Sequence, residues 1–473
     1  MSTDRKILAM LNGGKEINSS MIQELINAHG EIAGVYLNKY EKYKQEKLAI
    51  QERVFEDDTK INNKLANDFR SSIIDQVVGY MFGTPITYGV NEMNYGENEY
   101  SDIINKLDHF ITLSNLQDLD SETGKTCSIC GKAYRLCYIN DEGEESVTEI
   151  MPWETIVLKD QNRVKYALRY YKDYNAEGKE ITKVEWYDDT HIYTFMQVEN
   201  DYVLESEPVE HLFQFCPVIE FENNKESMGD FDRVETLIDA YDRLISDNQN
   251  ELEEFRQAYM VFDGGAELEK EDVIRARRSG AFTVPEGCRP YFLTKDVNNT
   301  FNSEQKQILE ENIYKFSKSV NMSDEKFSGG EQSGESRKWK LIDLENKAIT
   351  KERKFAKSLK DMFKILCSAW NVKGLNLNYL DVYFSFTRTL PIDLSYYGEV
   401  ATKFKGILAD KTVLEMLPMI DDVEYELELQ AKEAEQKVLD QMNMMETMGG
   451  LPTSTEEEGE QEQNSDYTFG GDK

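Results

Sequence analysis

The segment from Ser303 to Trp370 constrains the fold most, because it reads as a helix, a polar loop and a longer helix. The first helix carries four apolar residues at a 4-3-4 spacing, which puts them on one face: Leu309, Ile313, Phe316 and Val320. The loop, Asn321 to Glu335, contains three glycines and no apolar residue after Phe327. It exceeds the roughly 2–8 residues that usually join two helices. Taken alone, such a loop is more often disordered; the alternative is a protrusion that contacts a partner.

The charge balance restricts how this chain could interact with nucleic acid. The 473 residues carry a net charge of −35, so the protein cannot wrap DNA by neutralising its phosphates with a basic surface. Contact with DNA would require local basic positions, or a passage whose wall does not adhere to the duplex. An acidic soluble cytoplasmic protein without a nucleic-acid partner is the commoner alternative.

The length and the apolar content set the class of protein. At roughly 150 residues per domain, the length predicts about three domains. No stretch approaches the roughly 20 apolar residues that span a bilayer, and Met1 to Glu16 lack the apolar run of a signal peptide. We therefore expect no membrane contact, synthesis in a reducing cytoplasm, and buried thiols rather than disulfides for the six cysteines.

The first half of the chain predicts helices followed by a sheet. An apolar stripe indicates a helix from about Lys64 to Phe82, which Gly83-Thr84-Pro85 ends. A second helix is expected from about Tyr100 to Gln117, followed by the polar stretch Asp118 to Lys125. Ala133 to Phe221 is rich in β-branched and aromatic residues in short runs separated by turn signals. A mostly antiparallel sheet beside helices makes the fold class α+β.

A long helix is expected from about Gly229 to Tyr259, roughly 45 Å in length. Its apolar residues alternate by three and four positions, which makes a heptad-like seam with one polar member, Asn248. A charged face on an isolated helix is ordinarily only solvated. The acidic residues on its other faces are Asp232, Glu235, Asp239, Asp242, Asp247, Glu251, Glu253 and Glu254.

Val261 to Asn302 separates this helix from the next and reads as a compact α/β insertion. Four arginines make it locally basic in an acidic protein: Arg275, Arg277, Arg278 and Arg289. After Pro391, helices are expected from about Leu394 to Leu408 and from Val423 to Met444. The acidic residues from Gly449 onward are expected to be disordered.

Motifs for catalysis or cofactor binding are largely missing from the sequence. Cys127 and Cys130 have the CxxC spacing of half a zinc site, but no second half follows; a redox pair is the other reading of this spacing. The four histidines are scattered, and there is no HExxH, Walker A, GxGxxG or GxSxG motif. The sequence therefore predicts no enzyme, no cofactor, no metal site and no catalytic residue.

Four sets of short segments carry a family resemblance through their order and spacing. They are Asn67 to Asp75 with Gly79 to Ile86; Gly131 to Tyr134; Pro217 to Asn224 with Leu237 to Tyr241; and Val320 to Glu325 with Ser333-Gly334, Lys340-Leu341 and Leu344 to Lys347. From about Asn63 to Glu426, the chain resembles the portal (head-to-tail connector) proteins of tailed bacteriophages.

The resemblance implies a ring, usually of twelve subunits, at one vertex of the phage head, with assembly in the host cytoplasm. Double-stranded DNA would pass through the ring during packaging, retention and ejection, without sequence-specific binding. The implied partners are the packaging terminase, head-completion and adaptor proteins, the scaffolding protein and the major capsid protein. The terminase would supply the energy. The first alternative is a capsid or scaffold protein without a DNA channel. A less favoured alternative is a CxxC redox or zinc-binding protein.

The resemblance also divides the chain into named parts. The wing would comprise 1–228 and the long helix and strand of 336–390; the stem would comprise the helices 229–260 and 303–320. The other parts would be the clip (261–302), the tunnel loop (321–335), the helical crown (391–446) and a disordered acidic tail (447–473).

Three sets of residues would then carry the function. The heptad-like seam would pack stem helices side by side around the ring, and acidic residues on the channel wall would repel phosphates and keep the duplex mobile. The wall residues would be Asp232, Glu235, Asp239, Asp242, Glu251 and Glu254. The DNA-facing loop residues would be Lys326, Ser328, Gly329, Gly330, Glu331, Gln332, Ser333, Gly334 and Arg337. The partner-docking residues of the clip would be Arg275, Arg277, Arg278 and Arg289.

The resemblance has one departure, at Glu335 and Ser336, where portal proteins usually have apolar residues. The start of the helix that follows the loop is therefore left open.

Overall fold

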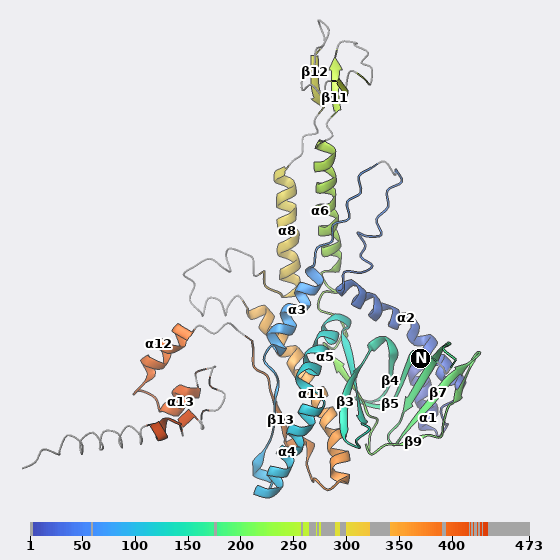
Figure 1. Ribbon diagram of the computed structural model, residues 1–473, viewed down its shortest axis with the longest axis vertical. Coiled ribbons are helices and arrows are strands. Elements are labelled where there is room, and N and C mark those ends of the chain that lie inside the picture. The colour runs from blue at the N-terminus through green and yellow to red at the C-terminus, as the bar shows by residue number, and fades with distance from the viewer. Residues whose placement is uncertain are drawn as a thin grey trace, which may run out of the picture. The chain divides into compact units, whose positions relative to one another are not determined.

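The computed structural model in Figure 1 describes most of the chain between residues 3 and 433. The described residues are 3–57, 60–174, 177–256, 259–263, 271, 274–275, 289–293, 299–321, 341–389, 394–415, 417, 420, 423, 426–427 and 429–433. The chain divides into two compact units, Met1–Leu390 and Pro391–Lys473. None of the helices within the described residues is long and apolar enough to cross a bilayer.

The larger sheet of the first unit is antiparallel, with neighbouring strands in the order β4-β5-β6-β7-β8 and β9 paired with β7. Its strands are β4 (Thr155–Asp160), β5 (Arg163–Tyr174), β6 (Glu180–Tyr187), β7 (His191–Val198), β8 (Asp201–Leu204) and β9 (Val209–Glu210). Two helices, α1 (Thr3–Asn12) and α2 (Ser19–Tyr43), pack on it. Ile7, Ile22 and Leu25 are buried in one cluster with Leu168 and Trp186 of the sheet.

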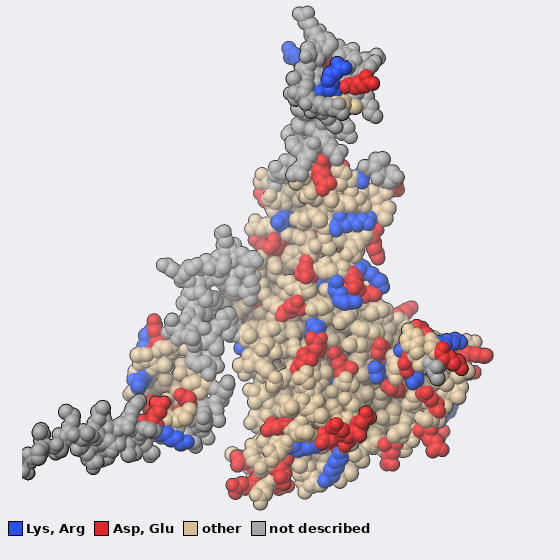
Figure 2. Space-filling model, in the orientation of Figure 1, with Lys and Arg blue, Asp and Glu red and all other residues tan. Residues whose placement is uncertain are grey.

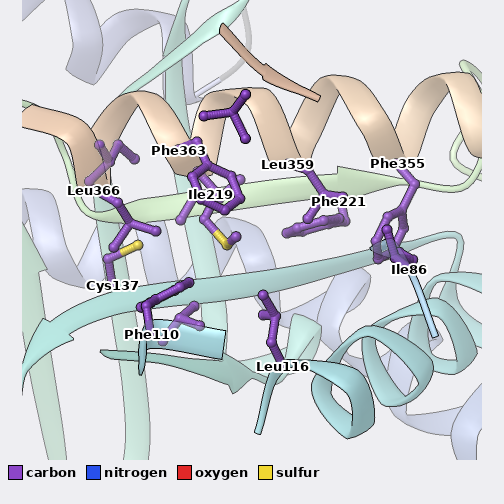
Figure 3. Packing of buried hydrophobic residues seen from close by; sticks show 14 of the residues in the cluster. Ile86, Phe110, Leu116, Cys137, Ile219, Phe221, Phe355, Leu359, Phe363 and Leu366 are labelled. Atoms are coloured by element: carbon purple, nitrogen blue, oxygen red, sulfur yellow. The ribbon is translucent and has the colours of Figure 1, made fainter. Parts of the chain in front are cut away.

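The smaller sheet has the order β10-β2-β3 and is also antiparallel. Its strands are β2 (Lys132–Ile139), β3 (Glu145–Ile150) and β10 (Val218–Glu222). The long helix α11 (Ile342–Val372) packs on β10. Figure 3 shows Phe355, Leu359, Phe363 and Leu366 of α11 pointing toward Ile219 and Phe221 of β10. The expected β-rich region and the α+β class are confirmed, with two sheets in place of one.

The helix boundary expected at Gln117 is wrong, because the polar stretch Asp118 to Lys125 is itself helical. The structure has two helices here, α4 (Glu97–Leu113) and α5 (Leu116–Cys130), separated at Asn115, whose φ of 44° interrupts the helix. Buried polar residues give α5 its polar sequence: the Asp120 carboxylate accepts hydrogen bonds from Arg135 at 2.8 Å and from the Tyr88 hydroxyl at 2.5 Å. A polar stretch is thus part of the core.

Three helices form a second packed group: α3 (Phe69–Phe82), α6 (Glu235–Arg256) and α8 (Asn299–Ser317). In Figure 1, α6 and α8 run side by side. Helix α6 is shorter at both ends than the helix predicted from Gly229 to Tyr259. Tyr259 belongs to a strand. That strand, β11 (Tyr259–Asp263), pairs antiparallel with β12 (Arg289–Leu293) within the segment predicted as an α/β insertion.

The remaining elements are short. In the first unit, β1 (Thr87–Val90) pairs antiparallel with β13 (Val382–Ser385). The described residues of this unit also include the 3-10 helices η1 (Glu92–Asn94), η2 (Pro152–Glu154) and η3 (Tyr379–Asp381). The described part of the second unit contains α12 (Leu394–Phe404) and α13 (Asp410–Glu415).

Candidate functional site

The apolar seam of α6 and the residues just before it face the interior of the first unit. Phe231, Val234 and Ile238 are fully buried, in a cluster that also contains Ile73 of α3 and Ile313 of α8. These seam residues are therefore used within the subunit. The expectation that they pack helices of neighbouring subunits is wrong for them, because α3 and α8 already cover that face.

The first two acidic candidates for a channel wall are paired with lysines of α2. The Lys39 ammonium lies 2.6 Å from the Asp232 carboxylate, and Lys42 pairs with Glu235. Lys39 and Lys42 lie one turn apart on α2, so this helix neutralises the start of the acidic face.

The next two acidic candidates are also satisfied inside the subunit. The guanidinium of Arg70, on α3, lies 2.6 Å from the Asp239 carboxylate and 4.0 Å from that of Asp242. Asp242 is only 1% exposed and accepts hydrogen bonds from the backbone and side-chain amides of Asn67. Burial raises the pKa of Asp242, although the hydrogen bonds from Asn67 and the charge of Arg70 oppose this shift. Asp239 and Asp242 are thus both paired inside the subunit, Asp242 in the interior and Asp239 with its side chain 24% exposed.

The last two acidic candidates are Glu251 and Glu254. Glu254 is exposed and Glu251 is half-buried near the end of α6. Figure 2 shows acidic and basic side chains interspersed on the visible face, without a continuous acidic surface. The acidic composition of the sequence therefore overstates the negative charge that this face of α6 presents.

The polar face of α6 has a role that the sequence did not reveal, because it binds an extended segment. The backbone amides of alternate residues donate to side chains four positions apart on α6: Asn63 to Asn250 at 2.8 Å, Leu65 to Ser246 at 3.0 Å and Asn67 to Asp242 at 2.9 Å. Two extended residues advance about 6.6 Å and four helical residues about 6 Å, so the two periods match. We call Asp242, Ser246 and Asn250 the polar ladder.

The polar ladder explains why the helix predicted from Lys64 begins only at Phe69. The backbone amides of Asn63, Leu65 and Asn67 bond to side chains of α6, and these bonds hold the segment in a non-helical conformation up to Phe69.

A buried ion-pair cluster joins the start of α11 to the segment before α6. Lys351 lies 2.5 Å and Lys347 3.5 Å from the Asp230 carboxylate. Burial alone would raise the pKa of Asp230, but the charges of Lys347 and Lys351 lower it to about 2. Burial lowers the pKa of Lys347 to about 8, against the effect of Asp230. The cluster fixes α11 firmly at its N-terminal end.

The predicted loop residues, Lys326 to Arg337, all lie outside the described residues. The described chain stops at Asn321 and resumes at Leu341, so that α11 begins at Ile342. The structure therefore describes the two attachment points of this segment, and not the residues expected to face DNA.

Two of the four clip arginines are described, and both are exposed. They are Arg275, and Arg289 at the start of β12; Arg277 and Arg278 lie outside the described residues.

The CxxC cysteines are buried at the end of α5. The Cys127 thiol donates to the Phe221 carbonyl, and the Cys130 thiol to the Tyr36 carbonyl. Burial raises the pKa of both thiols, that of Cys130 to about 12. Within the described residues, no three histidine, cysteine or acidic side chains are grouped so as to hold a metal ion. A reactive redox pair requires an accessible thiolate, which neither cysteine provides here.

Comparison with known proteins extends over nearly the whole chain. The family described as "Phage portal protein, SPP1 Gp6-like" matches residues 22–438. A portal protein of Bacillus phage SPP1 is 27% identical over 476 residues, which cover 93% of this chain and 92% of that protein. A portal protein of Clostridium phage phiCD119 is 23% identical over 434 residues, which cover 85% of this chain and 90% of that protein.

Proposed function

The chain belongs to the SPP1 Gp6-like family of phage portal proteins, and from this premise we propose how its parts form and use a portal ring. A portal protein is a structural component of the virion and not an enzyme. It provides the channel for DNA at one vertex of the capsid. We propose that identical copies of this chain form a closed ring, with twelve as the expected number of subunits.

Exposed apolar side chains on α6 and α8 support ring formation. Leu252 is 48% exposed, Ile308 48% and Phe316 51%, whereas Ile238 of α6 and Ile313 of α8 are buried in the cluster with α3. Large apolar side chains on a rigid helical surface are stabilised when a partner covers them. A second copy of the chain, placed by rotation about the ring axis, would cover them in every subunit. This is the structural observation that carries the ring proposal.

The channel wall can be proposed more narrowly than the sequence allowed. Glu254 is exposed near the end of α6, which makes it the first candidate for a carboxylate on the channel wall, and Glu251, one turn earlier, is half-buried. Asp232, Glu235, Asp239 and Asp242 are paired with cations of α2 and α3. These pairs leave the start of α6 close to neutral rather than basic. A wall without excess cations does not hold DNA by counterion release, so the duplex stays mobile.

We propose that the segment 321–335 is the tunnel loop and that Lys326, within it, and Arg337, two residues after it, are the basic contacts with DNA. Deletion of Ser328 to Gly334 should leave rings intact and impair DNA packaging in a reaction with terminase and empty heads. Normal packaging by rings of the deletion variant would remove the loop from the mechanism.

The insertion 261–302 is proposed as the clip, which docks the terminase and later the adaptor proteins. Its exposed arginines suit an acidic partner surface, because complementary charge favours association. Replacement of Arg277 and Arg278 by glutamate should weaken terminase or adaptor binding, and unchanged affinity would exclude a role for this charge. The wing (1–228 and 336–390), the stem (229–260 and 303–320), the crown (391–446) and the acidic tail (447–473) are proposed from the family on the same basis, together with contacts to scaffolding and major capsid proteins.

A further inference from the structure

The side chain of Gln76, on α3, both donates a hydrogen bond to the backbone of Val320 and accepts one from it, as a peptide group of a neighbouring strand does. Its side-chain amide donates to the Val320 carbonyl at 2.7 Å, and its side-chain oxygen accepts from the Val320 amide at 2.7 Å. Val320 is the second-to-last described residue before the segment 322–340. The chain that enters this segment is thus fixed to α3 by two hydrogen bonds from one side chain.

Tyr80, one turn later on α3, holds the chain that leaves the same segment. Its hydroxyl donates to the Glu345 carboxylate of α11 at 2.6 Å. Arg388 donates to the same carboxylate at 3.0 Å. Burial alone would raise the pKa of Glu345, but the hydrogen bonds from Arg388 and Tyr80 lower it overall. Glu345 is therefore ionised at neutral pH and is a strong acceptor for Tyr80.

A third contact joins the two ends directly. The Lys347 ammonium of α11 donates to the Ser317 carbonyl, in the last residue of α8, at 3.0 Å. Residues four apart on a helix face the same side, about 6 Å apart along its axis. Gln76 and Tyr80 thus present two attachment points on one face of α3, and Lys347 prevents α8 and α11 from separating beside them.

We propose that α3 acts as a clamp for the segment 322–340, with Gln76 and Tyr80 as positioning residues that fix where the segment leaves and re-enters the fold. The proposal rests on the proposed function of this segment as the tunnel loop. A force on the segment would be transmitted to α3 and, through the ion pair of Arg70 with Asp239, from α3 to α6. The loop and the stem would then move together.

The clamp can be tested without DNA by hydrogen–deuterium exchange on the purified full-length protein. Gln76→Ala removes the acceptor of the Val320 amide. Hydrogen exchange of the Val320 amide should become about two- to tenfold faster, as expected for the loss of one hydrogen bond. Gln76→Glu keeps an acceptor for that amide but loses the donor to the Val320 carbonyl, and it should restore only part of the protection. Tyr80→Phe keeps the ring and removes only the hydroxyl, and it should speed exchange in 341–346.

Two control variants each remove one hydrogen bond to α3, or to its N-cap residue, that does not involve the residues flanking the segment 322–340. Tyr43→Phe removes a hydroxyl that donates to Asp75 at 2.8 Å, and Gln45→Ala removes the amide that bonds to Asp68. Neither should change exchange at Val320 or in 341–346. Equal exchange at Val320 in Gln76→Ala and Gln45→Ala would overturn the clamp.

DNA packaging by intact rings then separates the clamp from the proposed function. Packaging that falls in Gln76→Ala and Tyr80→Phe, but not in the controls, supports the positioning role. If deletion of Ser328 to Gly334 impairs packaging but the two clamp variants package normally, the positioning role is wrong and the loop function stands. If the deletion variant packages normally, the loop function fails, and the exchange rates alone decide whether α3 holds the segment.

Discussion

The Arg70 guanidinium on α3 lies 2.6 Å from the Asp239 carboxylate on α6, and the Arg70 side chain is fully buried. The Asp242 carboxylate is 4.0 Å away and is also buried. A helix face that reads as solvated and acidic in the sequence is thus an internal contact between two helices. This changes which residues of α6 remain for a channel wall.

Replacement of Arg70 by methionine should destabilise the subunit strongly. The substitution leaves Asp239 and Asp242 without their cation, and removal of one partner of a buried ion pair typically costs about 3–5 kcal/mol. Urea unfolding would measure the free energy of unfolding. The matched control is Lys172→Met, because its pair with Glu180 is exposed and exposed pairs contribute about 0–1 kcal/mol. Equal effects of the two substitutions would contradict a structural role for Arg70.

The Asp230 cluster should make stability depend on acidic pH. The pKa of Asp230 is about 2 in the folded protein and 3.8 in an unperturbed carboxyl group. Because the folded value is the lower one, the stabilisation is complete above about pH 4 and is lost as the pH falls through about 2. The shift corresponds to about 2 kcal/mol. Asp230→Asn should be less stable at neutral pH and should show a flatter loss of stability between about pH 4 and 2. Parallel pH profiles for the two proteins would exclude this assignment.

The polar ladder should protect the extended segment before α3. Ser246→Ala removes the acceptor of the Leu65 amide, and the net loss of one hydrogen bond costs about 0.5–1.5 kcal/mol. The Leu65 amide should exchange faster, whereas Thr350→Ala, which removes an exposed hydroxyl bond within α11, should have no such effect. Unchanged exchange at Leu65 would mean that Ser246 does not hold the segment.

The exposed apolar side chains of α8 should be needed for assembly and not for folding. Ile308→Glu places a charge where we propose that a neighbouring subunit packs, so rings should be lost while the circular dichroism spectrum is retained. Gln307→Glu adds the same charge at an adjacent exposed position and should still form rings. If Ile308→Glu assembles as well as Gln307→Glu, this part of α8 does not lie at the subunit interface.

Local sequence patterns predicted the elements that pack through apolar periodicity. The spacing of Phe231, Val234 and Ile238 predicts an apolar face, and the structure buries all three residues, although Phe231 and Val234 precede α6. The same patterns missed the contacts made by polar side chains between distant segments. Asp120 makes α5 look like a loop because its partners, Tyr88 and Arg135, lie in other elements. The Leu65–Ser246 bond joins residues 181 positions apart, and neither residue carries a local signal for it.

Native mass spectrometry of the purified full-length protein, with negative-stain images of the same sample, tests the ring most directly. The account predicts closed rings of one size with a central hole, with twelve subunits expected. Shells or filaments would favour a capsid or scaffold role without a channel. A persistent monomer at high concentration, also in the presence of the other head proteins, would contradict the portal ring.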